Sequence, residues 1–369
     1  MVTPLKDPIE KWFFRHFAVV IPALYGLRLL VQYAMAPDEV PYTWRYDVVR
    51  TASEMALLLA FFMGNRFLAA IDPTLVALTA NRLLRPRKQP ENASSGSDPL
   101  LHRRLERWLN DRARIAVGTL AAVISALYYW QKGNFVRPAS SAGLLAYLDV
   151  ALYLVPVAYV YFLGVLAWRM GVIAVFFWSV TRTHHIVPQL LHPDHLCGFA
   201  VIGELCLRII YVAVVPALVS GVFLLWPYIP LLSQYGSPNE TLEVFARGIL
   251  CAGIVGLLLG WGVLWKFHKA IVDYLGQWQI DIAQLADRLI AEKQSVLSLA
   301  ANADVDLLAA RLKRIAELQQ LYDSNRHVRT WPLDRAKAVR LWGSVVILAG
   351  QVAAVMETFP RILGALGGP

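Results

Sequence analysis

The chain has 369 residues, of which 57% are hydrophobic and only 17% are charged. Soluble globular proteins carry about 25% charged residues, so this composition excludes a disordered chain and argues against an ordinary soluble enzyme. The apolar residues gather in runs of about 20, the length of helix that crosses a bilayer. The composition therefore predicts an all-α, polytopic helical membrane protein that is embedded in the lipid bilayer.

The net charge of +9 reflects 35 Lys and Arg against 26 Asp and Glu. In a membrane protein such an excess is typical of cytoplasmic loops, so no nucleic acid is expected as a partner. The three cysteines are an odd number without a CxxC pair, which argues against a disulfide framework or a zinc ribbon. The chain contains no P-loop, no GxSxG and no GxGxxG after a strand, so we expect no cofactor and no standard enzyme activity.

Seven apolar runs are long enough to be membrane-spanning helices. In chain order they are 17–35, 48–71, 115–130, 143–180, 199–229, 242–267 and 338–359. The second run is interrupted by charges and is either a full span or a re-entrant or broken helix. We expect the third to extend the helical run before it, and the fourth to project beyond the bilayer as one long helix. Gly253, Gly256 and Gly260 in the sixth run predict close helix packing.

Positive charge predicts how these helices are oriented. The loops at 82–114, 169–195 and 266–340 are basic, and they alternate with the loops at 36–47, 131–141 and 230–241, which carry few Lys or Arg. Basic loops stay in the cytoplasm, so we expect the N-terminus in the cytoplasm and the C-terminus in the periplasm. The predicted organisation is a transmembrane bundle over 1–265 with a cytoplasmic linker at 82–114, a cytoplasmic helical hairpin over 266–336, and a last transmembrane helix over 337–369.

The hairpin prediction comes from two apolar seams with heptad spacing. They run through Ile271, Leu275, Trp278, Ile282, Leu285 and Leu289, and then through Val305, Leu308, Leu312 and Ile315. Two such helices joined by a short loop are expected to pack antiparallel. Their seam would face itself, other cytoplasmic helices of the same chain or a neighbouring subunit. A homo-oligomer and a cytoplasmic protein partner are therefore both candidate assemblies.

A histidine-rich segment follows the fourth run. It contains His184, His185, His192, Asp194, His195 and Cys197 within fourteen residues. Imidazole, carboxylate and thiolate are usual ligands of zinc and other transition metals, so one interpretation is a metal or proton-coupled site at the cytoplasmic mouth. The other interpretation is a loop in which His192, Pro193 and Asp194 cap the fifth span, with Asp194 near the positive end of the helix dipole.

Among the charged residues inside the apolar runs, five are candidates for a polar path or for polar contacts between helices: Arg28, Glu54, Arg66, Glu204 and Arg208. Charges inside a membrane are costly, so they usually face the bundle interior, where they pair or contact water. Glu204 and Arg208 are four residues apart on one helix face and are expected to pair. The five residues would form either a polar pathway for an ion or anionic substrate, or structural contacts between helices.

Two short stretches resemble motifs of a family of uncharacterised bacterial polytopic membrane proteins. The stretches are HPDHLCGF at 192–199 and TWPLD at 330–334, the second just before the last span. The family carries an HPD-x-x-Gly-Gly loop and a Trp-Pro-Phe-Asp stretch in the same order. Here His192, Pro193, Asp194 and Gly198 match the loop, while Cys197 replaces its first glycine. The resemblance implies a bacterial inner-membrane protein and supplies no catalytic residues.

Three functions are compatible with these patterns. The first is a channel or transporter-like protein that uses the intramembrane charges as its pathway. The second is a membrane-anchored sensor or effector, whose hairpin and HPD loop bind a soluble partner. The third is a metal-dependent membrane enzyme acting on lipid, which rests on the histidine-rich segment alone.

Overall fold

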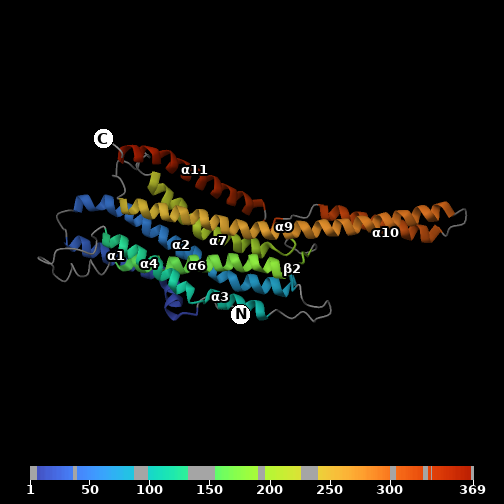
Figure 1. Ribbon diagram of the computed structural model, residues 1–369, viewed down its shortest axis with the longest axis horizontal. Helices are drawn as coiled ribbons and strands as arrows, with labels where there is room; N and C mark the ends of the chain where they lie inside the picture. Colours follow the sequence, from blue (N-terminus) through green and yellow to red (C-terminus); the bar gives the residue numbers. More distant parts are fainter. Residues whose placement is uncertain are drawn as a thin grey trace.

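The computed structural model describes residues 6–35, 40–86, 99–131, 154–189, 196–225, 240–299, 305–326, 331–333 and 335–366, and most of them are helical. Figure 1 shows long helices lying roughly side by side, with the end of α9 and all of α10 projecting from the bundle. The elements are α1 (Pro8–Met35), α2 (Val40–Ala80), β1 (Leu84–Pro86), α3 (Pro99–Leu109), α4 (Ala113–Gln131), α6 (Leu154–Thr183), β2 (His184–Ile186), α7 (Ala200–Leu225), α9 (Glu240–Leu299), α10 (Val305–Arg326) and α11 (Arg335–Leu366).

Five helical stretches of the described chain are long and apolar enough to cross a membrane, as judged by length and composition. They are Pro8–Val31, Glu54–Ala80, Leu154–Thr183, Ala200–Gly221 and Arg247–Ala291. The third and last expected spans are the helices α4 and α11, which are not among these five. The helical, membrane-type architecture is thus supported, while the number of seven spans stays a prediction. The second expected span is not a broken helix, because α2 is continuous through it.

The third expected span does not continue the helical run before it. Helix α3 ends at Leu109 and α4 begins at Ala113, with a turn between them. The Asp111 side chain accepts a hydrogen bond from the Ala113 amide at 3.1 Å. Asp at such a position caps the start of a new helix rather than extending the previous one. The expectation of one extended helix was therefore wrong, and Asn110-Asp111 is the reason.

A small β-ladder ties the expected linker at 82–114 to the end of α6, so the chain is not purely helical. Strands β1 and β2 pair antiparallel, with Leu84 opposite Ile186. The Val187 amide donates to the Leu83 carbonyl at 3.0 Å, which continues the ladder. Each strand has only three residues, too few for an alternating pattern to be visible in the sequence.

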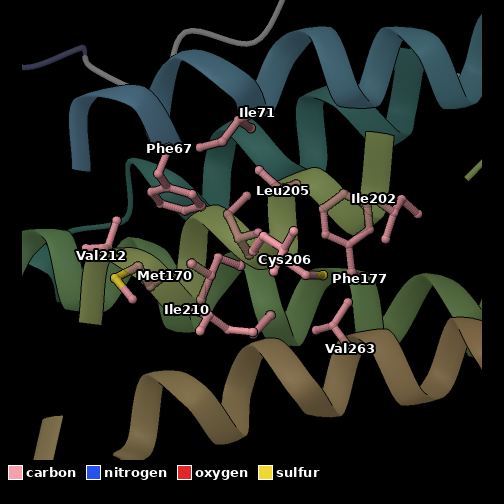
Figure 2. Close-up of a cluster of buried hydrophobic side chains, with 14 of the residues drawn as sticks. Phe67, Ile71, Met170, Phe177, Ile202, Leu205, Cys206, Ile210, Val212 and Val263 are labelled. Carbon is pink, nitrogen blue, oxygen red and sulfur yellow. The ribbon is translucent and has the colours of Figure 1, made fainter. Parts of the chain in front are cut away.

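The main core lies between α2, α6, α7 and α9. Figure 2 shows Phe67 and Ile71 of α2, Phe177 of α6 and Val263 of α9 gathered around the buried face of α7. Helices α7 and α9 approach closely at the glycines predicted to allow it. A Cβ atom added at Gly256 would lie 2.1 Å from the Ala213 Cβ, so a larger residue there would push the two helices apart.

Helix α9 extends far beyond the bundle and forms the hairpin with α10. Its 60 residues correspond to about 90 Å of helix, three times the thickness of the hydrocarbon core. Helix α10 folds back along it (Figure 1). Ile271 and Leu275, at the start of the seam, pack into the main core, whereas Leu285 and Leu312 are exposed. The first part of the seam therefore faces the same subunit, and apolar surface stays uncovered farther out on the hairpin.

Candidate functional site

A buried ion-pair network joins three helices of the bundle. Arg169 of α6 is completely buried, and Glu10, in the first turn of α1, is only 1% exposed. One Glu10 oxygen accepts from Arg169 Nη2, and the other accepts from Arg114 Nε of α4 at 2.9 Å. Two guanidinium groups therefore share one carboxylate, at a place where an unpaired charge would be very costly.

Local capping places Glu10 and Arg114 for this contact. Asp7 caps α1, because its Oδ1 accepts from the Ile9 amide at 2.9 Å. Arg114 Nη1 also donates to the Asn110 carbonyl at 2.6 Å, at the end of α3. The start of α1 and the junction between α3 and α4 are thereby fastened to the middle of α6.

Arg169 has more donors than Glu10 satisfies. Its Nε and Nη1 atoms are buried and make no hydrogen bond to any residue that the structure describes. Buried N–H groups of a charged side chain require a partner, which in a polar site is ordered water or an anion. This is the clearest unmet hydrogen-bonding capacity among the charges of the bundle.

A second cluster contains three of the five candidate residues within the spans, of which Glu204 and Arg208 contribute their charges and Arg66 contributes its backbone carbonyl. On α7, Arg208 Nη2 pairs with Glu204 Oε1 at 2.5 Å, and Arg208 Nη1 donates to the Arg66 carbonyl of α2 at 2.8 Å. The Glu204 side chain is about half exposed and that of Arg208 about one third exposed. Glu54 lies twelve residues before Arg66 on α2, about 18 Å away along the helix axis. The Arg28 side chain is outside the described residues.

The two clusters lie at similar heights in the bundle. Gly64 of α2 packs against Leu166 of α6, one turn before Arg169. Gly118 of α4 packs against Val165 of α6, and Arg114 and Arg169 each lie four residues from that crossing. Arg208 contacts the backbone carbonyl of Arg66, which is two residues after Gly64 on α2. The charges therefore form one layer across α1, α2, α4, α6 and α7.

The described part of the histidine-rich segment does not assemble a metal site. His184 and His185 are neighbours in β2, where His184 is buried and His185 exposed. Successive strand residues point to opposite faces, so they cannot bind one ion together. Cys197 is buried, and no group of three metal-binding side chains occurs among the residues described. His192, Pro193, Asp194 and His195 lie outside the described residues, so both interpretations of the HPD loop stay open.

The described parts of the stretches 192–199 and 330–334, which are residues 196–199 and 331–333, both lie near the start of α7. Cys197 and Gly198 have φ angles of 58° and 86°, and the Gln189 amide donates to the Cys197 carbonyl at 3.1 Å. One turn into α7, a Cβ atom at Gly203 would lie 1.5 Å from the Pro332 carbonyl oxygen. The segment 331–333 therefore rests directly on the helix that the HPD loop introduces.

Sequence reasoning missed the buried network. Arg169 is the first residue of the basic loop expected at 169–195, and its burial was not predicted. The available signal was that Arg169 is the only charged residue between 150 and 180. Glu10 lies in an N-terminal stretch of mixed charged and apolar residues, and nothing in that stretch indicated that Glu10 would be buried. Its burial depends on contacts with residues more than 100 positions away.

No protein-family model, no curated protein and no solved structure is significantly similar to this chain. The class that the structure supports is a helical membrane protein, from its five long apolar helices.

Proposed function

We propose that the protein is channel-like or transporter-like and moves ions or a small solute along a polar path between α1, α2, α6 and α7. The observation that best supports this is Arg169, which is buried in an apolar bundle with two donor atoms unmatched by described residues. Such a group offers a passing anion or water a hydrogen-bonding site in a low-dielectric environment. The half-exposed pair of Glu204 and Arg208 lies in the same layer and would form an entrance.

The proposed location is the bacterial inner membrane, with seven crossings, a cytoplasmic N-terminus and a periplasmic C-terminus. The alternation of basic and weakly basic loops supports this orientation, and the resemblance of the HPD and TWPLD stretches supports the bacterial membrane. Reporter fusions after the described ends of α4 and α11 test the orientation, because both are proposed to end on the periplasmic side.

A liposome flux assay tests the polar path. The full-length protein is expected to release chloride or another small anion from loaded liposomes. The double variant Glu10→Gln with Arg169→Met removes one buried positive and one buried negative charge together. Arg114, the other partner of Glu10, keeps its contact with the Asp7 carboxylate at 3.7 Å. We expect at least a tenfold loss of flux in this variant.

The matched control for the flux assay is Lys313→Gln with Arg314→Gln, which changes two exposed residues of the projecting α10. This control should transport like the wild type. The proposal is wrong if no ion or small solute moves through the wild type, or if the bundle variant and the wild type transport equally.

The exposed hairpin favours a second function, a sensor or effector that binds a protein partner. Leu285 and Leu312 expose apolar side chains on α9 and α10, beyond the part of α9 that packs into the core. Affinity purification of the full chain should retain a partner, or a second copy, that Leu285→Glu with Leu312→Glu loses and that the Lys313/Arg314 control keeps. Identical sets of proteins for all three chains would contradict this function.

A further inference from the structure

Five aromatic rings form a continuous cluster where α9, the segment 331–333 and α11 meet. His268 stacks on Trp331, with ring centres 4.2 Å apart and planes within 13°. Trp331 lies 5.2 Å from Trp261 and 6.0 Å from Trp265, and Trp261 lies 5.7 Å from Trp342. Trp265 and Trp342 are about half exposed. The cluster therefore presents indole rings on the outer surface of the bundle.

Two exposed stripes run through this cluster, and each changes from apolar to basic in the same direction. On α9 the stripe contains Val255, Leu258, Trp265 and Lys269, and on α11 it contains Val346, Trp342, Val339 and Arg335. The spacings of three, four and seven residues keep each set on one helix face. The two basic ends lie together because Trp261, on α9, contacts both Trp331 and Trp342.

The charge around the aromatic cluster is predominantly positive. Positions 261–272 of α9 and 335–350 of α11 contain Lys or Arg at five places and no acidic residue, with Asp273 and Asp334 next to their ends. Glu204, on the neighbouring helix α7, is already paired with Arg208. The ammonium group of Lys266 lies 4.5 Å from the centre of the Trp178 ring of α6, which adds to the positive surface.

The cluster also lies at the height of the charged layer. Gly260, next to Trp261, packs against Ile210 and the Cys206 carbonyl on α7, the turns on either side of Arg208. Tryptophan is enriched where a membrane protein passes from hydrocarbon to headgroups. Basic surfaces between helices at that depth attract the headgroups of anionic lipids.

We propose that the surface between α9 and α11 is a binding site for an anionic phospholipid. The acyl chains lie along Val255, Leu258 and Val346, the glycerol region lies against the indoles of Trp265 and Trp342, and the phosphate is held by Lys269 and Arg335. The order of apolar, aromatic and basic residues matches the order of chain, backbone and headgroup in such a lipid. The site depends on the membrane location and not on the polar path, so either proposal can fail without the other.

Quenching of tryptophan fluorescence tests the lipid site on the purified full chain. Phosphatidylglycerol with brominated acyl chains is expected to quench the cluster at a lower mole fraction than brominated phosphatidylcholine does. Removing the charges in Lys269→Gln with Arg335→Gln should weaken the apparent affinity for the anionic lipid by about fivefold for each charge removed. The affinity for the zwitterionic lipid should not change.

Two control variants test whether the preference for the anionic lipid arises at the surface between α9 and α11. Lys313→Gln with Arg314→Gln removes the same charge from the hairpin and should keep the full preference for the anionic lipid. Trp265→Phe with Trp342→Phe should lose the preferential quenching while still binding the lipid. Thermal unfolding of each variant shows whether it is folded. Equal quenching of the wild type by both lipids, or an unchanged preference in the Lys269/Arg335 variant, would overturn the proposal.

Discussion

Arg169→Met is expected to lower the free energy of unfolding by about 3–5 kcal/mol, because it leaves the buried Glu10 carboxylate without its closest cation. Arg114 still contacts Glu10 and compensates part of the loss. The measurement is thermal or denaturant unfolding of the detergent-purified chain. Glu10→Gln should have a comparable effect, because it leaves the guanidinium of a completely buried arginine unpaired.

The double variant Glu10→Gln with Arg169→Met should recover part of this loss, since it removes both charges of the Glu10–Arg169 pair. Arg114 loses Glu10 as a partner but keeps its longer contact with Asp7. Arg208→Met is the matched control, because Arg208 pairs with a half-exposed glutamate. Partly exposed pairs contribute only about 0–1 kcal/mol. A double variant that is as unstable as the sum of the two single variants, or an Arg169→Met protein as stable as Arg208→Met, would show that the pair is not energetically coupled as described.

Gly203→Ala is expected to destabilise the chain by about 1–3 kcal/mol or more, because the new methyl group collides with backbone rather than with a flexible side chain. The clash is with the Pro332 carbonyl oxygen, 1.5 Å from the added carbon. The segment 331–333 must move off α7, and Trp331 should move with it. Tryptophan fluorescence and unfolding of the purified chain report the two effects separately.

Gly276→Ala is the control for this substitution. Gly276 lies within α9, and a Cβ atom there would meet nothing within 4 Å. Alanine at such a helical position stabilises by about 0.5–1 kcal/mol relative to glycine. The free energy of unfolding is therefore expected to fall in Gly203→Ala and to rise in Gly276→Ala. A neutral Gly203→Ala variant would contradict the close packing of the segment 331–333 against α7.

Features that depend on local sequence were predictable. The apolar runs and the heptad spacing predicted long helices and a hairpin, and the stripe of Gly253, Gly256 and Gly260 predicted the close approach of α9 to another helix. The i,i+4 spacing of Glu204 and Arg208 predicted their ion pair. Each of these is a property of one helix, which the period of 3.6 residues makes visible.

Features that depend on two distant segments were not predictable in the same way. The pairing of β1 with β2 joins strands of three residues, and the carbonyl that Arg208 contacts belongs to a backbone that carries no sequence signal. The partners of Glu10 lie 104 and 159 residues away. Only the three-dimensional packing of α1 against α4 and α6 shows that Glu10 is buried at all.

Helix α9 gives the molecule a mechanical property. It contains no proline over its 60 residues, so it lacks a common cause of sharp kinks in helices. About 30 residues extend past Lys269, so a tilt of about 10° within the bundle would carry the hairpin tip sideways by about 8 Å. Because one helix connects the membrane part to the hairpin, a change in the tilt of α9 within the bundle would also move the hairpin.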